Sequence, residues 1–144
     1  ARWRLFLFAP AHDVGRPGGA VAALCDWLEH DRASPLRRHT APGEDVDAVI
    51  DTRAVFQQGL HELDYAAMPT LLRPHVGRYG LCDYEKVFCV DVKRGEDVFA
   101  MRGIDRAAGC VVVVRPDQYV GHVLPLSAHG ELAAYFAGVL RVRD

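Results

Sequence analysis

The sequence predicts an α/β domain with a mixed central sheet and helices on both of its faces. Apolar runs of strand length alternate with stretches of helical spacing, and the last third reads as two strands followed by a helix. The 144 residues are enough for one hydrophobic core without cross-links. Half of the residues are hydrophobic and a quarter are charged, as in soluble globular domains. We therefore expect a single domain over residues 1–144.

The first half of the chain alternates between strand and helix patterns. Residues 3–8 are a short run rich in aromatic side chains, which predicts a strand, and the prolines and glycines of residues 9–19 predict a loop. The next segment is predicted to be a helix because its apolar residues have helical spacing, namely Val21, Leu24, Cys25 and Leu28. Residues 31–44 are polar and contain two prolines, so we expect an exposed connection. A second strand is expected within residues 46–56, around Ala48-Val49-Ile50.

The middle of the chain has weaker patterns. Residues 62–72 have helical spacing that Pro69 weakens. Residues 86–92, up to Val92, are nearly continuous β-formers, as expected of a strand that is covered on both faces. A short helix is expected over residues 97–102.

The last third predicts a hairpin and a closing helix. Residues 110–114 and 119–124 are strand candidates, and the turn between them places Pro116 at its second position, where the fixed φ of proline is favourable. Ser127 offers an N-cap to the final helix. The apolar stripe of that helix is Leu132, Tyr135, Phe136, Val139 and Leu140. Early βα units with a closing ββα unit predict a thioredoxin-type fold.

Charge and composition argue against several partners. The formal net charge is −2, and the one dense basic spot, Arg37-Arg38-His39, is interpreted as a solvated corner, so nucleic acid is not an expected partner. No apolar run approaches the roughly 18 residues that span a bilayer, and no signal peptide is evident, so no membrane partner is expected. The chain begins without methionine and enters a strand at once, which we interpret as a piece of a longer polypeptide.

The cysteines are interpreted as structural. They form no C-x-x-C pair and match no common zinc spacing. We expect reduced thiols and therefore a cytoplasmic protein, because disulfides are rare in that compartment. The four residues are Cys25, Cys82, Cys89 and Cys110.

Three segments in the second half carry a family resemblance. They are Asp83-Tyr84-Glu85-Lys86-Val87-Phe88 with Val90-Asp91, then Met101-Arg102-Gly103-Ile104-Asp105, then the VVVVRPDQYV of residues 111–120. A strand, a G-I-D turn and a V-V-V-R-P-D-x-Y-V hairpin in this order resemble the C-terminal thioredoxin-like domain of flavin-dependent phenol hydroxylases. The closing helix is also in keeping with that domain. The motif residues are Gly103, Ile104, Asp105, Arg115, Pro116, Asp117 and Tyr119.

The resemblance implies a longer enzyme, in which an FAD-binding domain and a substrate domain precede this chain. Such an enzyme uses NAD(P)H and oxygen to hydroxylate a phenolic ring. The resemblance also implies that this domain contacts those domains and takes part in a homo-oligomer. The chain itself lacks a G-x-G-x-x-G after a strand, because Gly15, Gly18 and Gly19 have the wrong spacing. We therefore expect no cofactor, metal or catalytic residue within it.

The positions where thioredoxin-fold enzymes work hold other residues here. Such enzymes use a low-pKa thiolate at the start of the first helix, where residues 9–15 contain no cysteine. Cys25 lies further along, on the apolar face, where burial would raise its pKa. A cis-proline before the hairpin is also expected in redox members, but residues 103–109 contain no proline. Both departures argue against dithiol or peroxidatic activity.

Other polar residues have plainer interpretations. His12-Asp13 is interpreted as a capping and turn pair rather than an acid–base pair. His61-Glu62 does not begin an H-E-x-x-H motif because Tyr65 stands at the fifth position. His122 is expected to be partly exposed and hydrogen-bonded. The two serines, Ser34 and Ser127, lie in no G-x-S-x-G motif, which argues against acyl transfer.

Arg115 has two interpretations. Its guanidinium can lock the hairpin by pairing with Asp117, or it can reach across a domain interface. Tyr135 and Phe136 are interpreted as core residues.

Three functions are left open by the sequence. The leading hypothesis is a non-catalytic accessory domain for assembly of an FAD-dependent aromatic monooxygenase. The first alternative is a stand-alone thioredoxin-like scaffold protein. The second is a redox enzyme with a relocated thiol at Cys82 or Cys89.

Overall fold

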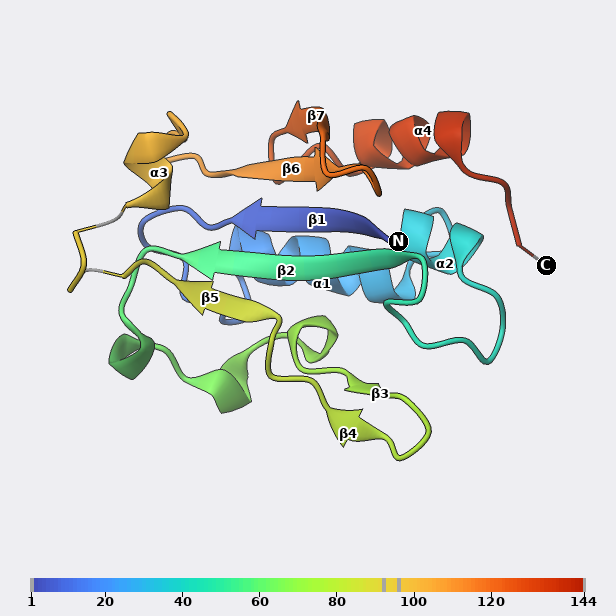
Figure 1. Cartoon of the computed structure of the whole chain (residues 1–144), viewed down its shortest axis with the longest axis horizontal. Coiled ribbons are helices and arrows are strands. Elements are labelled where there is room, and N and C mark those ends of the chain that lie inside the picture. Colours follow the sequence, from blue (N-terminus) through green and yellow to red (C-terminus); the bar gives the residue numbers. More distant parts are fainter. Residues whose placement is uncertain (1, 92, 96, 144) are drawn as a thin grey trace.

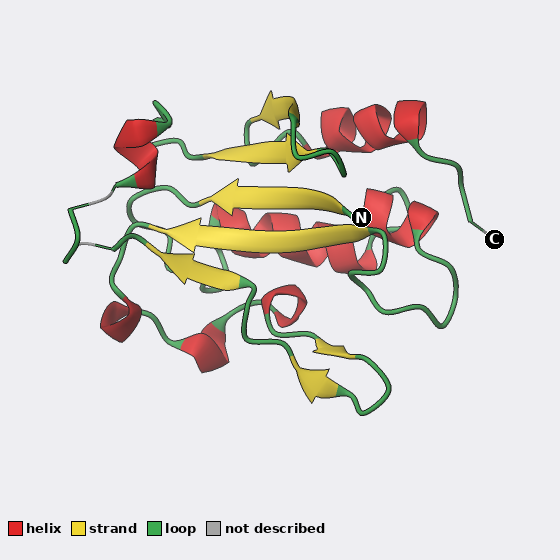
Figure 2. Ribbon diagram, in the orientation of Figure 1, coloured by secondary structure: helices red, strands yellow, loops and turns green. Residues whose placement is uncertain are grey.

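The computed structural model describes residues 2–91, 93–95 and 97–143 (Figures 1 and 2). Its helices are α1 (Ala20–His30), α2 (Pro35–His39), α3 (Val98–Met101) and α4 (His129–Val139). Its strands are β1 (Trp3–Phe8), β2 (Ile50–Phe56), β3 (His75–Val76), β4 (Leu81–Cys82), β5 (Val87–Cys89), β6 (Cys110–Val114) and β7 (Val120–Leu124).

Five strands form a mixed sheet in the order β5-β2-β1-β6-β7 (Figure 1). β1 lies at its centre, parallel to β2 and antiparallel to β6. β5 extends the sheet in parallel at one edge, and β7 extends it antiparallel at the other. β3 and β4 form a separate two-stranded ribbon. The first βα unit, β1 with α1, and the closing unit of β6, β7 and α4 follow one another as the sequence predicts.

One face of the sheet carries the main hydrophobic core. Alternate residues of β1, such as Leu5 and Leu7, point into it because successive strand residues point to opposite faces. The apolar stripe of α1 covers these strands, and α1 runs behind β1 and β2 in Figure 1. α4 adds Leu132 and Phe136, and the Phe136 ring meets that of Trp3 edge-on at 5.4 Å.

The opposite face is covered less completely. α3 packs over one end of it through Phe99, which is fully buried against Phe8 and Val55. In Figure 1 α3 lies at the left end of the sheet, and the strands to its right face the viewer uncovered by a helix. This open face therefore leaves Phe88 and Val123 exposed.

The arrangement confirms the predicted mixed α/β class, and it is consistent with a thioredoxin-like fold. The strands at residues 3–8 and 110–114, the first helix and the closing hairpin lie where the sequence predicts them. Within residues 2–91, 93–95 and 97–143 no helix has both the length and the apolar character needed to cross a bilayer.

The expectation of an exposed connection over residues 31–44 is wrong in part, because α2 lies within it. Ser34 accepts a hydrogen bond from Arg37 N–H, and Pro35 occupies the first helical position, where its missing N–H costs nothing. The prediction that the basic residues 37–39 are all exposed to solvent is also wrong, because His39 is buried. His39 is 1% exposed, and its Nδ1 donates to the carbonyl of Arg141 at 2.8 Å.

Two further boundaries differ from the prediction. β2 begins only at Ile50, so Ala48 and Val49 precede the strand. Residues 62–72 form no α-helix; three 3₁₀ turns, at Leu60–Glu62, Tyr65–Ala67 and Thr70–Leu72, span this region instead. Asp64 and Pro69 each start a new turn, because the Asp64 side chain accepts from Ala66 N–H and proline cannot continue a helix.

The predicted strand over residues 86–92 is shorter and more exposed than expected. β5 has three residues at the sheet edge, and the Phe88 side chain is 39% exposed because no helix covers that end of the open face. Val92 lies outside the described residues. The Ser127 cap is also wrong, since α4 begins at His129 and has Ala128 in the capping position.

Candidate functional site

The candidate site is the N-terminal end of α1, where enzymes with this fold carry their reactive thiol. The loop of residues 9–19 leads from β1 to this end of the helix. Asp13 is buried there, and its carboxylate is the group that meets the helix. Oδ1 accepts a hydrogen bond from Gly15 N–H at 2.9 Å, and Oδ2 accepts from Val21 N–H at 2.8 Å. The interpretation of Asp13 as a capping residue is confirmed, while His12 beside it is exposed.

Two glycines make room for this arrangement. A Cβ on Gly19 would lie 2.8 Å from Asp13 Oδ1. Gly15 has a φ of +81°, and a Cβ there would lie 2.5 Å from the sulfur of the buried Met68. Both positions therefore need glycine for the Asp13 carboxylate to stay under the helix.

The occupied helix end has a chemical consequence. Free N–H groups at a helix N-terminus attract an anion, which can be a thiolate or the pyrophosphate of a dinucleotide. Here the Asp13 carboxylate fills that position from within the chain. An FAD pyrophosphate does not fit these residues, because its negative charge would meet that of Asp13.

Burial raises the pKa of three of the four cysteines in the described structure. Cys25 is fully buried on α1, and burial, with smaller effects of Glu29 and Asp13, raises its pKa far above the ordinary range. Burial also raises the pKa of Cys89 and of Cys110. Cys82 donates to the carbonyl of Arg73 at 3.7 Å. All four are free thiols.

The G-I-D motif forms the turn that follows α3. Gly103 has a φ of +63°, which ends the helix in the left-handed conformation that glycine favours. Ile104 packs against the Phe99 cluster. Asp105 Oδ1 accepts from Ala107 N–H at 2.8 Å and fixes the path toward β6.

The R-P-D-x-Y motif forms the turn of the β6–β7 hairpin. Arg115 N–H donates to the carbonyl of Tyr119 at 2.8 Å, and the Arg115 guanidinium lies 2.5 Å from Asp117 Oδ2. The expected pairing of Arg115 with Asp117 is therefore present. Both side chains are about half exposed, so this pair adds little to stability. Tyr119 is 71% exposed beside it.

His61 and His122 lie away from the start of α1 and from the two motif turns. Glu62, next to His61, accepts from Gly59 N–H and so closes a 3₁₀ turn. His122 is exposed on β7, and its ring lies against Tyr135 with 5.4 Å between centroids. In the described part of the chain, histidines, cysteines and carboxylates gather in no group that could hold a metal ion.

A buried ion network is the main feature that sequence reasoning missed. Lys86 is 1% exposed, and its Nζ lies 2.6 Å from Asp51, 2.7 Å from Asp47 and 3.2 Å from Asp83. Arg53 pairs with Asp51 at 2.9 Å. Arg2 pairs with Asp47 at 3.0 Å.

The charges in this network stabilise one another. Burial by itself would lower the pKa of Lys86, but the hydrogen bonds to Asp47 and Asp51 outweigh burial and raise it. Burial would raise the pKa of Asp83, but Glu85 N–H and Lys86 lower it on balance. The one available signal was a lysine directly beside the apolar run of β5 in a chain with only two lysines.

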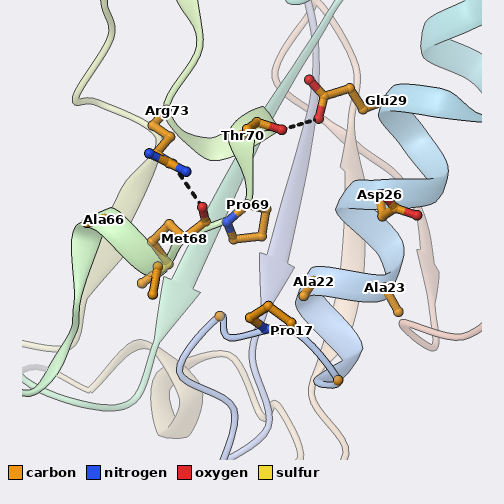
Figure 3. Close-up of a pocket in the computed structure, with 13 residues that line it drawn as sticks. Pro17, Ala22, Ala23, Asp26, Glu29, Ala66, Met68, Pro69, Thr70 and Arg73 are labelled. Atoms are coloured by element: carbon orange, nitrogen blue, oxygen red, sulfur yellow. Dashed lines mark hydrogen bonds between the residues drawn. The ribbon is translucent and has the colours of Figure 1, made fainter.

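A groove of about 670 Å³ lies beside α1 (Figure 3). Small residues of α1, among them Ala22 and Ala23, form one wall, and the segment from Ala66 to Arg73 forms the other. Thr70 donates to Glu29 at 2.5 Å, and Arg73 Nε donates to the carbonyl of Met68 at 2.9 Å. Asp26, the third carboxylate or hydroxyl side chain of the lining, is exposed and lies 3.2 Å from His30 Nδ1. No cysteine, serine or histidine is among the described residues that line the groove.

The fold and this site define a class: a thioredoxin-like domain whose usual position for chemistry is filled by its own carboxylate. Residues 1–144 match the family described as phenol hydroxylase, C-terminal dimerisation domain. The chain belongs to this family, as the resemblance in its sequence implies.

The chain is similar to part of two longer proteins, both named as monooxygenases. The chain is 51% identical over 141 residues to 3-hydroxybenzoate 4-monooxygenase of Comamonas testosteroni, a match that covers 97% of the chain and 22% of the relative. It is 29% identical over 145 residues to the FAD-dependent monooxygenase terD of Aspergillus terreus, with 97% and 23% covered. The chain thus spans less than a quarter of the length of these relatives. The alternative of a stand-alone scaffold protein is not favoured.

Proposed function

We propose that this chain is the C-terminal part of an FAD- and NAD(P)H-dependent aromatic hydroxylase, in which it joins subunits and does no chemistry itself. The family match over residues 1–144 carries this proposal. The Asp13 carboxylate at the start of α1 supports the non-catalytic role, because it occupies the place of a reactive thiolate. The raised pKa values of Cys25, Cys89 and Cys110 argue against a reactive thiol at these three positions.

The preceding domains of the same polypeptide would hold the flavin and the substrate. Two relatives are named as monooxygenases, and one of them is named for 3-hydroxybenzoate. A phenolic ring is therefore the substrate class that we infer for the whole enzyme. The motif residues from Gly103 to Asp105 and from Arg115 to Tyr119 would act structurally, by fixing the turns on either side of β6.

We also infer a cytoplasmic location, without nucleic-acid or membrane partners. Four free cysteines suit a reducing compartment. The net charge of −2 offers no attraction to a phosphate backbone.

The test uses the full polypeptide that the gene encodes. We expect it to bind FAD, to oxidise NAD(P)H when a phenol is added, and to be a dimer or larger by light scattering. A second form that lacks residues 1–144 should retain FAD but lose subunit association. A full polypeptide without bound FAD, or one that is strictly monomeric, would contradict the proposal.

A further inference from the structure

The two edges of the five-stranded sheet differ in how well they are protected. Sheet edges carry unpaired N–H and C=O groups, which proteins usually shield with charged side chains, proline or very short strands. β5 follows this rule: it has three residues, and the exposed Glu85, Asp91, Lys93 and Arg94 flank it in the sequence. β7 has five residues, Val120–Leu124, and none of them is formally charged at neutral pH.

The absence of charge extends well beyond the strand itself. Residues 118–130 contain no aspartate, glutamate, lysine or arginine, although a quarter of the whole chain is charged. In the sequence this stretch is bounded by Asp117, which pairs with Arg115 at the hairpin turn, and by Glu131 in the first turn of α4. The β7 edge therefore lacks the charges that would keep a second strand away.

Apart from the exposed imidazole of His122, the exposed side chains of this edge are mainly apolar. Tyr119 is 71% exposed, Val120 61% and Val123 54%. Val120 and Val123 pair with Val114 and Val112 of β6, so both point to the open face of the sheet. An uncharged edge with apolar neighbours is suited to pairing with another strand.

We propose that β7 is the strand through which two copies of this chain pair, antiparallel and across a two-fold axis, so that two five-stranded sheets become one. This inference rests on the proposed role in subunit association and names the surface that performs it.

A second copy is the occupant that fits this edge best. When two copies pair through the same edge strand, each contributes the same surface to the interface, as two-fold symmetry requires. A strand with charged side chains would repel its own copy in such a pair, because like charges would face each other. β7 has no formally charged residue, so this repulsion is absent. The family to which the chain belongs is itself described as a dimerisation domain.

Charge substitution tests the edge directly. In the full polypeptide, Val123→Lys or Val120→Lys puts one ammonium group on each of the two paired strands, close to the two-fold axis. We expect the dimer dissociation constant to rise at least about 100-fold in sedimentation equilibrium. Val142→Lys is the matched control, since Val142 is also 54% exposed but lies after α4. Phe88→Lys places the same charge on the opposite edge of the sheet. Both controls should stay dimeric.

Cysteine scanning gives a positive readout that does not depend on weakening the dimer. Facing residues of antiparallel strands are about 4.5–5.5 Å apart between Cα atoms, which suits a disulfide. A cysteine substituted singly from Tyr119 to Leu124 should cross-link to its own copy under mild oxidation at one or two adjacent positions only. The unsubstituted polypeptide shows the background from its native thiols, which include the four of this chain.

The outcomes separate this inference from the proposed function. A dimer that keeps its dissociation constant in both valine variants and cross-links at no scanned position would overturn β7 pairing, while subunit association would stand. A polypeptide that is monomeric at every concentration before any substitution would overturn both.

Discussion

Replacing Lys86 by methionine should destabilise the domain strongly. The substitution keeps most of the side-chain volume but removes the cation that three carboxylates share at 2.6, 2.7 and 3.2 Å. Removing one partner of a buried ion pair costs about 3–5 kcal/mol. In the variant Arg53 still pairs with Asp51, and Arg2 still pairs with Asp47. We therefore expect the free energy of unfolding to fall by about 3 kcal/mol, the lower end of this range.

This loss should depend on pH in a defined way. The pKa of Lys86 is raised in the folded state, so its contribution is fully present below the ordinary lysine pKa of about 10 and is lost as pH rises through the folded value. The pKa of Asp83 is lowered, so its contribution is present above its ordinary value of about 4 and is lost as pH falls through the folded value. The difference between the Lys86→Met variant and the unsubstituted chain should be largest between about pH 5 and 10 and should shrink in acid.

Urea unfolding at 25 °C, followed by the fluorescence of the two tryptophans, measures both effects. Lys93→Met is the control, because Lys93 is the other lysine of the chain and is exposed. It should change the free energy of unfolding by less than about 0.5 kcal/mol. A cost of Lys86→Met under about 1 kcal/mol, or one as large at pH 3 as at pH 7, would show that Lys86 does not hold these carboxylates together.

Three other predictions concern the site and the turns. Asp13→Ala should lower the free energy of unfolding by about 2 kcal/mol, because two N–H groups lose their acceptor. Asp13→Asn should lower it by less. A change near zero in chemical denaturation would contradict the capping role. Cys25 should be the slowest thiol to react with a disulfide reagent in the folded protein, because burial raises its pKa, and rapid labelling by mass spectrometry would disprove this. Gly109→Ala should cost more than about 2 kcal/mol in a thermal melt, because a Cβ at this position clashes with the carbonyl of Phe8, while Gly18→Ala, with positive φ but open space, should cost about 1 kcal/mol.

The fold could be predicted where hydrophobic pattern and topology agree. β1 and β6 are short apolar runs and α1 has helical spacing, and each contributes buried residues to the same core. The region between β2 and β5 could not be predicted in the same way. Its apolar residues, such as Met68 and Leu72, are buried at helical spacing, but Pro69 prevents a continuous helix, so short turns place them instead.

The site was only partly accessible from the sequence. The absence of cysteine from residues 9–15 and the His12-Asp13 pair are visible in the local sequence. They predicted a capping and turn role at this position instead of a reactive thiolate. The Lys86 network depends on carboxylates that are 35 and 39 residues away, and only the pairing of β5 with β2 brings them together. The same applies to His39, whose partner Arg141 lies at the other end of the chain.

The unequal cover of the two sheet faces has a consequence for slow motions. The α3 segment is attached mainly through the small Phe8, Val55 and Phe99 cluster, whereas α1 and α4 share the large core on the other face. Regions with few buried apolar contacts open at a lower free energy than the global transition. Backbone amides of α3 should therefore exchange with deuterium long before those of β1 and β6. Local opening at this end would leave the central strands, and the β7 strand beside them, in place.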